Sequence, residues 1–192
     1  MPTITALSAE NQARVLEQYR DWNVNDNHWT ECVIDDAKHI GALIGFDIDK
    51  VYWTGFWSQG DGACFEGICY LRPGGPVLVR RYAPEDTDLH DIADVWVSEH
   101  RRSGWGWVCS IKQRGHYCHE NCTEFNWTHE AHPWEDPENV KALEDVARRF
   151  MRWIYDRLED EYKHLTSDEA VIDALEANEV EFEIDEDGEL IL

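Results

Sequence analysis

Apolar residues recur every three to four positions in five segments of the chain, and this spacing predicts five helices. The segments span residues 8–22, 30–44, 86–102, 137–163 and 166–177. Ser8 is expected to cap the first helix and Gly45 to end the second. Thr166 and Glu169 have the spacing of a capping box for the last helix.

Apolar and polar residues alternate elsewhere, which predicts strands over residues 49–57, 64–71, 105–114 and 116–127. The first pair turns at Gly60-Asp61-Gly62 and the second pair at Gly115. Residues 129–136 are expected to form a loop, and residues 180–192 a hairpin over Asp187-Gly188.

These elements predict an α+β fold, in which an antiparallel sheet of about four strands is covered by helices on one face. We expect residues 1–165 to form the core domain. Residues 166–192 would add an acidic C-terminal helix and hairpin that packs on this core.

The chain is strongly acidic, and this limits its partners. It has 192 residues with 40 Asp and Glu against 17 Lys and Arg, a net charge of −23. From Asp156 onward there are 15 acidic residues and two basic ones. Such a field repels phosphate backbones and anionic membranes, so direct DNA binding is not expected. It favours a basic partner, such as a nucleic-acid-binding protein, although net charge also serves solubility alone.

Composition also bears on the compartment. With 43% hydrophobic residues and ten Trp, the chain has enough apolar material for a sizeable core. No stretch approaches the length of a membrane span, and the first residues lack the features of a secretory signal. We therefore expect a cytoplasmic protein whose six Cys are reduced thiols or metal ligands.

The run from Gly55 to Gly67 carries the clearest local signal. A Gly-Asp-Gly tip between two aromatic strands presents Ser58, Gln59 and Asp61. Glycine allows a ligand or another backbone to come close, so the tip is a candidate site for a small polar ligand. The alternative is a hairpin whose turn simply requires Gly and Asp.

Several Cys and His residues are clustered downstream, and because these are the usual ligands of zinc, a zinc site is a hypothesis for this segment. The residues are Cys109, His116, Cys118, His119 and Cys122, with Cys64 and Cys69 on neighbouring strands. No C-x-x-C pair is present, and strand geometry would send Cys118 and His119 to opposite faces. The alternative is a set of small buried thiols.

An enzyme would pair Asp61 or Glu66 with His116 or His119 as general acid and base, or use Cys64 as a nucleophile. The chain contains no P-loop, G-x-S-x-G or H-E-x-x-H motif, so a non-enzymatic role is favoured. Four Trp form a candidate stacking surface, with the buried core as the alternative. They are Trp53, Trp57, Trp105 and Trp107.

The chain resembles a family of small proteins encoded by bacteriophages. The resemblance rests on the block GFWSQGDGACFEG from Gly55, on RGHYCHE from Arg114, and on YKHLTSDEAV from Tyr162 with EVEF from Glu179. It implies an accessory protein acting in the bacterial cytoplasm, and some members are labelled antitoxins. Related sequences more often have Tyr at the position of Cys118, so a zinc site built on Cys118 would not be a family trait.

Two hypotheses follow. In the first, the protein binds and inhibits or sequesters a host component through its acidic surface, as an antitoxin or a mimic of DNA would. In the second, a polar site at the sheet end binds, and in one version hydrolyses, a small molecule such as a nucleotide. The candidate ligand- or partner-binding residues are Trp57, Ser58, Gln59, Asp61, Glu66, His116, His119 and Glu120.

Overall fold

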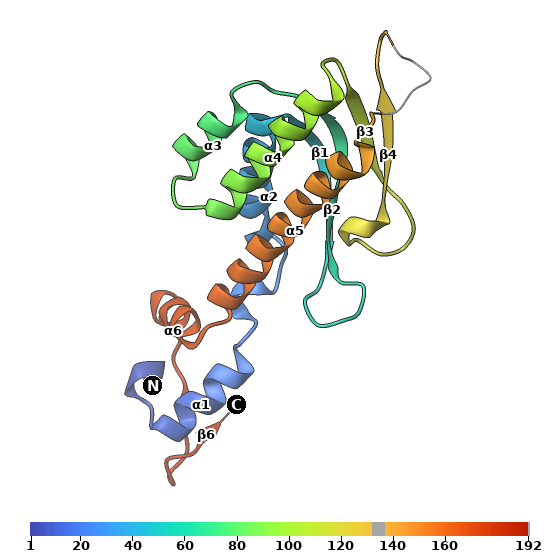
Figure 1. The fold of residues 1–192 in the computed structure, drawn as a ribbon. Coiled ribbons are helices and arrows are strands. Elements are labelled where there is room, and N and C mark those ends of the chain that lie inside the picture. The colour runs from blue at the N-terminus through green and yellow to red at the C-terminus, as the bar shows by residue number, and fades with distance from the viewer. Residues whose placement is uncertain (132–136, 192) are drawn as a thin grey trace. The chain divides into compact units, whose positions relative to one another are not determined.

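The computed structural model describes residues 1–131 and 137–191 and has the expected α+β fold (Figure 1). Its contacts divide the chain into two compact units. The sheet unit comprises Cys32–Leu158, and the terminal unit joins Met1–Glu31 with Glu159–Leu192. The expected boundary after residue 165 stays a prediction.

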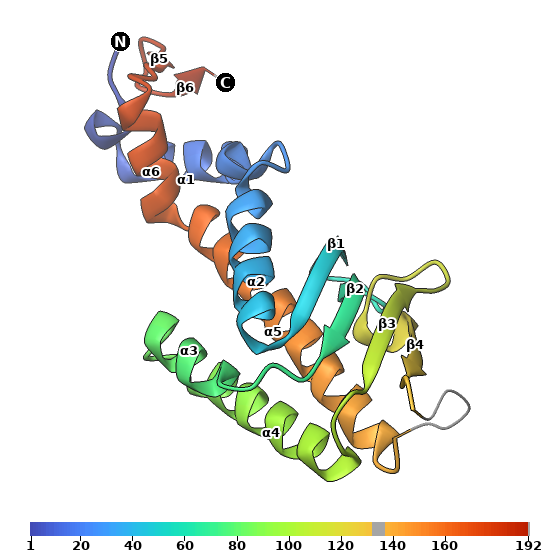
Figure 2. The same cartoon turned by 90° about the horizontal axis from the view of Figure 1, so that it is seen from above.

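The sheet unit contains four antiparallel strands in the order β1-β2-β3-β4. They are β1 (Phe46–Thr54), β2 (Gly62–Tyr70), β3 (Val108–Gln113) and β4 (Thr123–Thr128). Helices lie against one face of this sheet, as predicted (Figure 2). They are α2 (Trp29–Ile44), α4 (Thr87–Ser103) and α5 (Val140–Leu165), of which α2 begins and α5 ends in the terminal unit. The short helix α3 (Gly75–Tyr82) lies beside α4 (Figure 2).

Aromatic rings join the sheet to its helices. The Phe46 ring of β1 stacks on Phe150 of α5, with centroids 5.3 Å apart, and lies 4.5 Å from Trp96 of α4. Phe65 of β2 meets Phe46 edge-on at 5.7 Å. All four side chains are fully buried, so apolar residues from four elements form one core.

All four observed strands differ in their bounds from the predicted ones, β2 and β3 by one to three residues at each end. β1 begins at Phe46, not at residue 49, because the register shifts between Ile48 and Lys50 and this irregularity breaks the alternation of the sequence. β4 begins at Thr123, not at residue 116. Residues 114–122 instead form a loop that ends in a 3₁₀ turn, η3 (Glu120–Cys122), because the His119 side chain accepts a hydrogen bond from the backbone of Asn121.

Helix ends account for the other corrections. The predicted first helix is α1 (Ala9–Gln18), which the Ser8 side chain caps as expected, and it ends before residue 22. The predicted capping box at Thr166 is wrong, because Ser167 caps the last helix and Thr166 bonds back to Tyr162. The short helix α3 was not predicted, since Gly and Pro at its start favour a turn.

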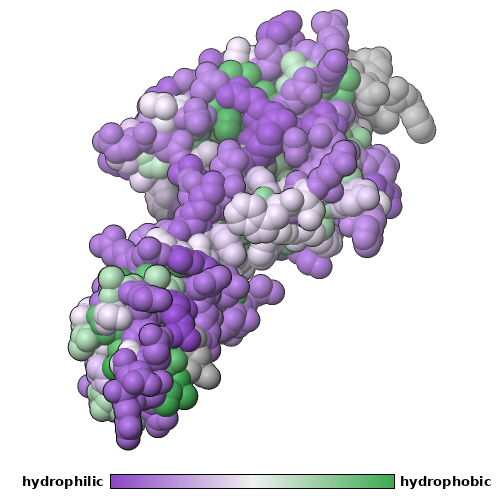
Figure 3. Space-filling view, turned by 90° about the horizontal axis from the view of Figure 1, so that it is seen from below, coloured by the Kyte–Doolittle hydropathy of each residue, from purple (hydrophilic) through white to green (hydrophobic). Residues whose placement is uncertain are grey.

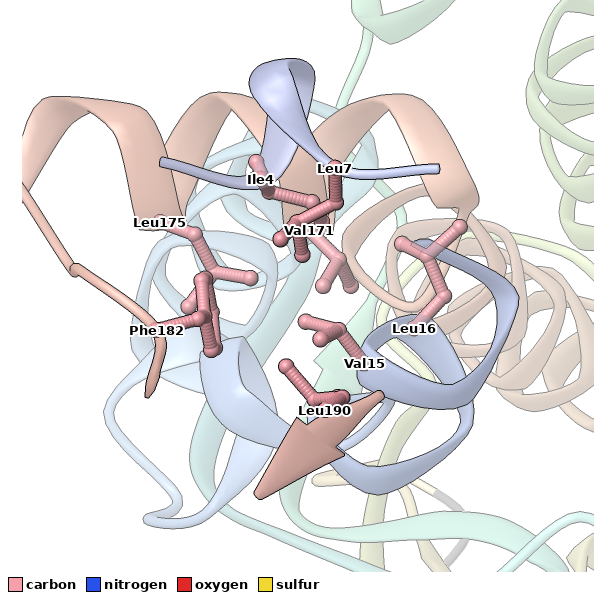
Figure 4. Packing of buried hydrophobic residues seen from close by; sticks show 8 residues of the cluster. All are labelled: Ile4, Leu7, Val15, Leu16, Val171, Leu175, Phe182 and Leu190. Atoms are coloured by element: carbon pink, nitrogen blue, oxygen red, sulfur yellow. The ribbon is translucent and has the colours of Figure 1, made fainter. Parts of the chain in front are cut away.

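The terminal unit has a core of its own, built from both ends of the chain (Figure 4). Its elements are η1 (Ile4–Ala6), α1, η2 (Trp22–Val24), α6 (Asp168–Ala177), β5 (Glu183–Ile184) and β6 (Leu190–Ile191). Eight buried side chains point toward one another: Ile4, Leu7, Val15, Leu16, Val171, Leu175, Phe182 and Leu190. The predicted C-terminal hairpin is present as β5 and β6, with Leu192 outside the described residues.

The predicted loop over residues 129–136 is described only through residue 131. Residues 132–136 lie outside the described residues.

Candidate functional site

Asp61 organises the tip between β1 and β2. One of its carboxylate oxygens accepts hydrogen bonds from the backbone N–H groups of Trp57 (2.9 Å) and Ser58 (2.6 Å). The Asp61 N–H in turn donates to the Ser58 carbonyl oxygen at 3.1 Å. Asp61 therefore has a structural role in the turn, whatever else it binds.

The loop of residues 114–122 packs against this tip, and two glycines make the close approach feasible. A Cβ at Gly62 would lie 2.5 Å from the Cβ of His119, and one at Gly60 would lie 2.8 Å from the Tyr117 ring. Gly60 also has a φ of +98°, which side chains rarely adopt. The sequence blocks that begin at Gly55 and at Arg114 thus lie against each other.

A pocket of about 530 Å³ opens where the tip and the loop meet. It is lined by Gln59, Gly60, Asp61, Tyr117, His119, Glu120 and Asn121. Four predicted site residues, Gln59, Asp61, His119 and Glu120, are thereby brought together. Their amide, carboxylate and imidazole groups are suited to a small polar ligand.

The other four predicted residues do not line this pocket. Trp57 and Ser58 belong to the tip, and the Trp57 side chain is 78% exposed. The ring of His116 lies 5.6 Å from that of Tyr117. Glu66 lies within β2, where its carboxylate accepts hydrogen bonds from the Tyr52 hydroxyl (2.9 Å) and the Gln113 N–H (3.2 Å). The hydrogen bond to Glu66 is the main cause that raises the pKa of Tyr52.

Internal bonds already engage several polar groups of the pocket, including those of His119 and Glu120. His119 Nδ1 accepts from the Asn121 N–H at 3.1 Å, and its Nε2 lies 3.5 Å from the Cys122 sulfur. Glu120 accepts a hydrogen bond from Arg152 of α5 at 3.0 Å. A role for His119 as general base would require these contacts to break, so the geometry favours binding over acid–base chemistry.

The neighbouring thiol of Cys64 is a poor nucleophile. Burial, followed by the nearby thiols of Cys118 and Cys122, raises the pKa of Cys64 to about 12. Cys64 is therefore protonated at neutral pH, and the nucleophile hypothesis loses support.

The same neighbourhood bears on zinc. Because His119 Nδ1 accepts a hydrogen bond, its proton lies on Nε2, the atom that faces Cys122. A metal ligand would need that nitrogen unprotonated. Within residues 1–131 and 137–191, no group of three or more His, Cys, Asp or Glu is arranged to hold a metal ion. Zinc binding stays a prediction from the sequence alone.

Sequence reasoning missed three residues that line the pocket: Gly60, Tyr117 and Asn121. Tyr117 lies between the His and Cys residues of its block, and its approach to Gly60 could not be read from the sequence. The hydrogen-bond partner of Glu120 could not be predicted from local sequence, because Arg152 lies on a helix that is far from Glu120 along the chain.

Residues 29–168 match the model of a protein family described as a domain of unknown function, DUF8835. The chain belongs to this family. The DUF8835 region contains all four strands of the sheet and the whole pocket, whereas residues 1–28 and 169–192 lie outside it. Comparison with curated proteins and with solved structures gave no match. Among the helices of the described residues, none combines the length and the apolar character needed to cross a membrane.

Proposed function

We propose that this protein is a phage-encoded accessory protein that binds a basic host protein in the bacterial cytoplasm and inhibits or sequesters it. The observation that carries the proposal is the distribution of charge between the two units. The terminal unit holds 19 acidic and 3 basic residues, a net of −16, in 65 residues. The sheet unit holds 21 acidic and 14 basic residues, a net of −7, in 127 residues.

Pairing within the terminal unit leaves this excess uncompensated. Its three basic side chains already have carboxylate partners, in the pairs Arg14–Glu189, Arg20–Asp168 and Lys163–Glu159. The unit is also folded around its own core, so its carboxylates project from an ordered scaffold. Hydrophilic residues cover much of the surface in the space-filling view (Figure 3). A dense acidic surface attracts a basic protein and speeds its association.

Salt and charge neutralisation test the proposal together. Glu183→Gln, Glu186→Gln and Asp187→Asn remove three charges from the terminal unit, and all three residues are exposed. Asp35→Asn, Asp49→Asn and Glu85→Gln remove three charges from exposed positions of the sheet unit and serve as the matched control. Each protein is used to capture partners from a bacterial lysate at low and at high salt, with identification by mass spectrometry.

We expect a basic polypeptide that is released at high salt, because surface charge pairs are screened. The terminal-unit variant should retain much less of it than the control variant. A captured partner that persists at high salt, or that both variants lose equally, would contradict the proposal.

The pocket at the sheet end supports a second candidate function, the binding of a small polar molecule such as a nucleotide. Gln59 lines the pocket and Ser58, its neighbour, does not. Native mass spectrometry of protein purified from a bacterial host should show a co-purified small molecule. Gln59→Ala should lose this molecule while Ser58→Ala keeps it, and apo protein in all three preparations would speak against this function.

A further inference from the structure

The turn that follows α1 forms a small pocket in the terminal unit. Its volume is about 230 Å³, and its lining comprises Gln18, Tyr19, Asp21, Trp22 and Asn25. All five residues come from one short stretch that runs from the last residue of α1 to the residue after η2. The pocket thus belongs to the most acidic part of the molecule and lies outside the DUF8835 region.

Two aromatic rings form one wall of this pocket. Tyr19 and Trp22 are three residues apart in a tight turn, where such side chains lie on the same side, and their ring centroids are 5.4 Å apart. The Trp22 N–H donates to the Tyr19 carbonyl oxygen at 2.9 Å, which fixes the turn. Tyr19 also meets Phe182 of the terminal core edge-on at 6.0 Å. Trp22 remains 40% exposed, so its ring is open to a partner.

The remaining lining is rich in hydrogen-bond acceptors. Asp21 precedes η2 but its side chain does not cap that turn. Its carboxylate accepts a long hydrogen bond, 3.4 Å, from Tyr162. The amides of Gln18 and Asn25 add two carbonyl oxygens. The adjacent cation, Arg20, is engaged by Asp168 and by the Thr166 carbonyl oxygen, and it does not line the pocket.

We propose that this pocket binds an arginine side chain of the basic partner. This inference rests on the proposed function. A guanidinium is planar, so it can stack on the exposed indole of Trp22 while its N–H groups reach the Asp21 carboxylate. Lysine carries the same charge as a compact ammonium that stacks less well and is held more strongly by water. The pocket therefore adds a preference for arginine to an attraction that charge alone provides.

The test compares two peptides of equal charge, hexa-arginine and hexa-lysine, by calorimetry at moderate salt. The unmodified chain should bind hexa-arginine roughly three- to thirtyfold more tightly, the range expected for a cation stacked on an aromatic ring. Trp22→Ala changes no charge and should reduce this preference to near unity, while salt-sensitive binding of both peptides persists. Trp105→Ala removes another exposed indole, from the sheet unit, and should leave the preference unchanged.

A folding measurement and a second substitution at Trp22 guard against a loss of structure, and a substitution at Asp21 tests the role of its carboxylate. Circular dichroism reports whether Trp22→Ala is folded, and Trp22→Phe, which keeps a ring, should keep part of the preference. Asp21→Asn should weaken hexa-arginine more than hexa-lysine. Equal affinity of the unmodified chain for both peptides, or an unchanged preference in folded Trp22→Ala, overturns the arginine pocket and leaves the proposed function standing. Failure to bind either peptide overturns both.

Discussion

His100 is a buried residue whose environment lowers the stability of the folded protein in mild acid. It lies in α4 with an exposed fraction of 0%, and its ring contacts those of Trp96 (4.3 Å) and Trp127 (5.9 Å). Neither ring nitrogen has a hydrogen-bond partner among the described residues. Burial lowers the pKa of His100 to about 4, against 6.5 for a free histidine, so the folded protein holds this ring neutral.

This lowered pKa predicts a loss of stability in mild acid. Between pH 6.5 and 4 the unfolded chain takes up a proton at His100 that the folded protein does not, so the free energy of unfolding falls as pH falls. The full loss is roughly 3 kcal/mol. His100→Phe removes this titrating group. Urea unfolding at pH 7, 6, 5 and 4 should show that the free energy of unfolding of the variant, relative to that of the unmodified chain, rises by about that amount as the pH falls. A constant difference across this range would contradict the prediction.

Burial also predicts which thiols react. It raises the pKa of Cys64 to about 12 and is the largest cause of the raised pKa of Cys69, whereas Cys32 is exposed. Because the thiolate is the reactive form, iodoacetamide at pH 8 should label Cys32 in the native protein. Cys64, Cys69 and Cys109, all buried, should be labelled only after unfolding. Peptide mass spectrometry measures this, and labelling of native Cys64 at the rate of Cys32 would refute it.

At the scale of elements, the sequence predicted the periodic segments and missed what depends on distant contacts. Helical spacing located α2, α4 and α5, because each buries one continuous apolar face. Alternation predicts a strand over residues 116–127, but residues 116–122 belong to the loop of residues 114–122. Tyr117 and His119 of this loop pack on the tip, and this packing prevents the loop from pairing with β3. The local sequence pattern cannot reveal such a contact. For the same reason, the sequence indicated that the tip and the loop of residues 114–122 carry candidate site residues, but it did not show which of these residues line the pocket.

The contact between the tip and the loop predicts that adding a single methyl group at Gly62 destabilises the protein. Gly62→Ala would place a Cβ 2.5 Å from that of His119, so the loop must shift, at a cost of about 1–3 kcal/mol in the free energy of unfolding. Gly74→Ala is the control, since Gly74 has a φ of +86° but no neighbour within 4 Å and reports backbone strain alone.

Urea unfolding gives both costs for these two variants. Proteolysis of the folded proteins should cut the loop of residues 114–122 faster in Gly62→Ala only. Equal cleavage in the two variants would show that this loop does not depend on the close approach.

At the scale of the whole molecule, total charge was evident from the sequence and its location was not. The acidic C-terminal segment was recognised, but its association with residues 1–31 depends on contacts such as the bond from the Phe182 N–H to the Pro2 carbonyl oxygen. That contact joins residues 180 positions apart. No local pattern encodes such a pairing, so the terminal unit could not be predicted.

Concentrated charge predicts that salt stabilises this protein. Like charges repel within the folded terminal unit, and ions screen that repulsion. The melting temperature of the unmodified chain should therefore rise as sodium chloride increases from about 0.02 to 0.5 M, a range over which the screening length falls severalfold. The three-charge variant of the terminal unit should gain less than its sheet-unit control. Equal gains would locate the repulsion elsewhere.

The terminal unit also imposes an order on biosynthesis. Residues 1–31 leave the ribosome before the sheet unit, and the segment that completes their core, Glu159–Leu192, leaves after it. Between them come 127 residues of the sheet unit, which take roughly 6 to 25 s to translate. During that interval the nascent N-terminal helix exposes Val15 and Leu16 without their native partners. The acidic surface is therefore assembled only after the sheet unit has been made.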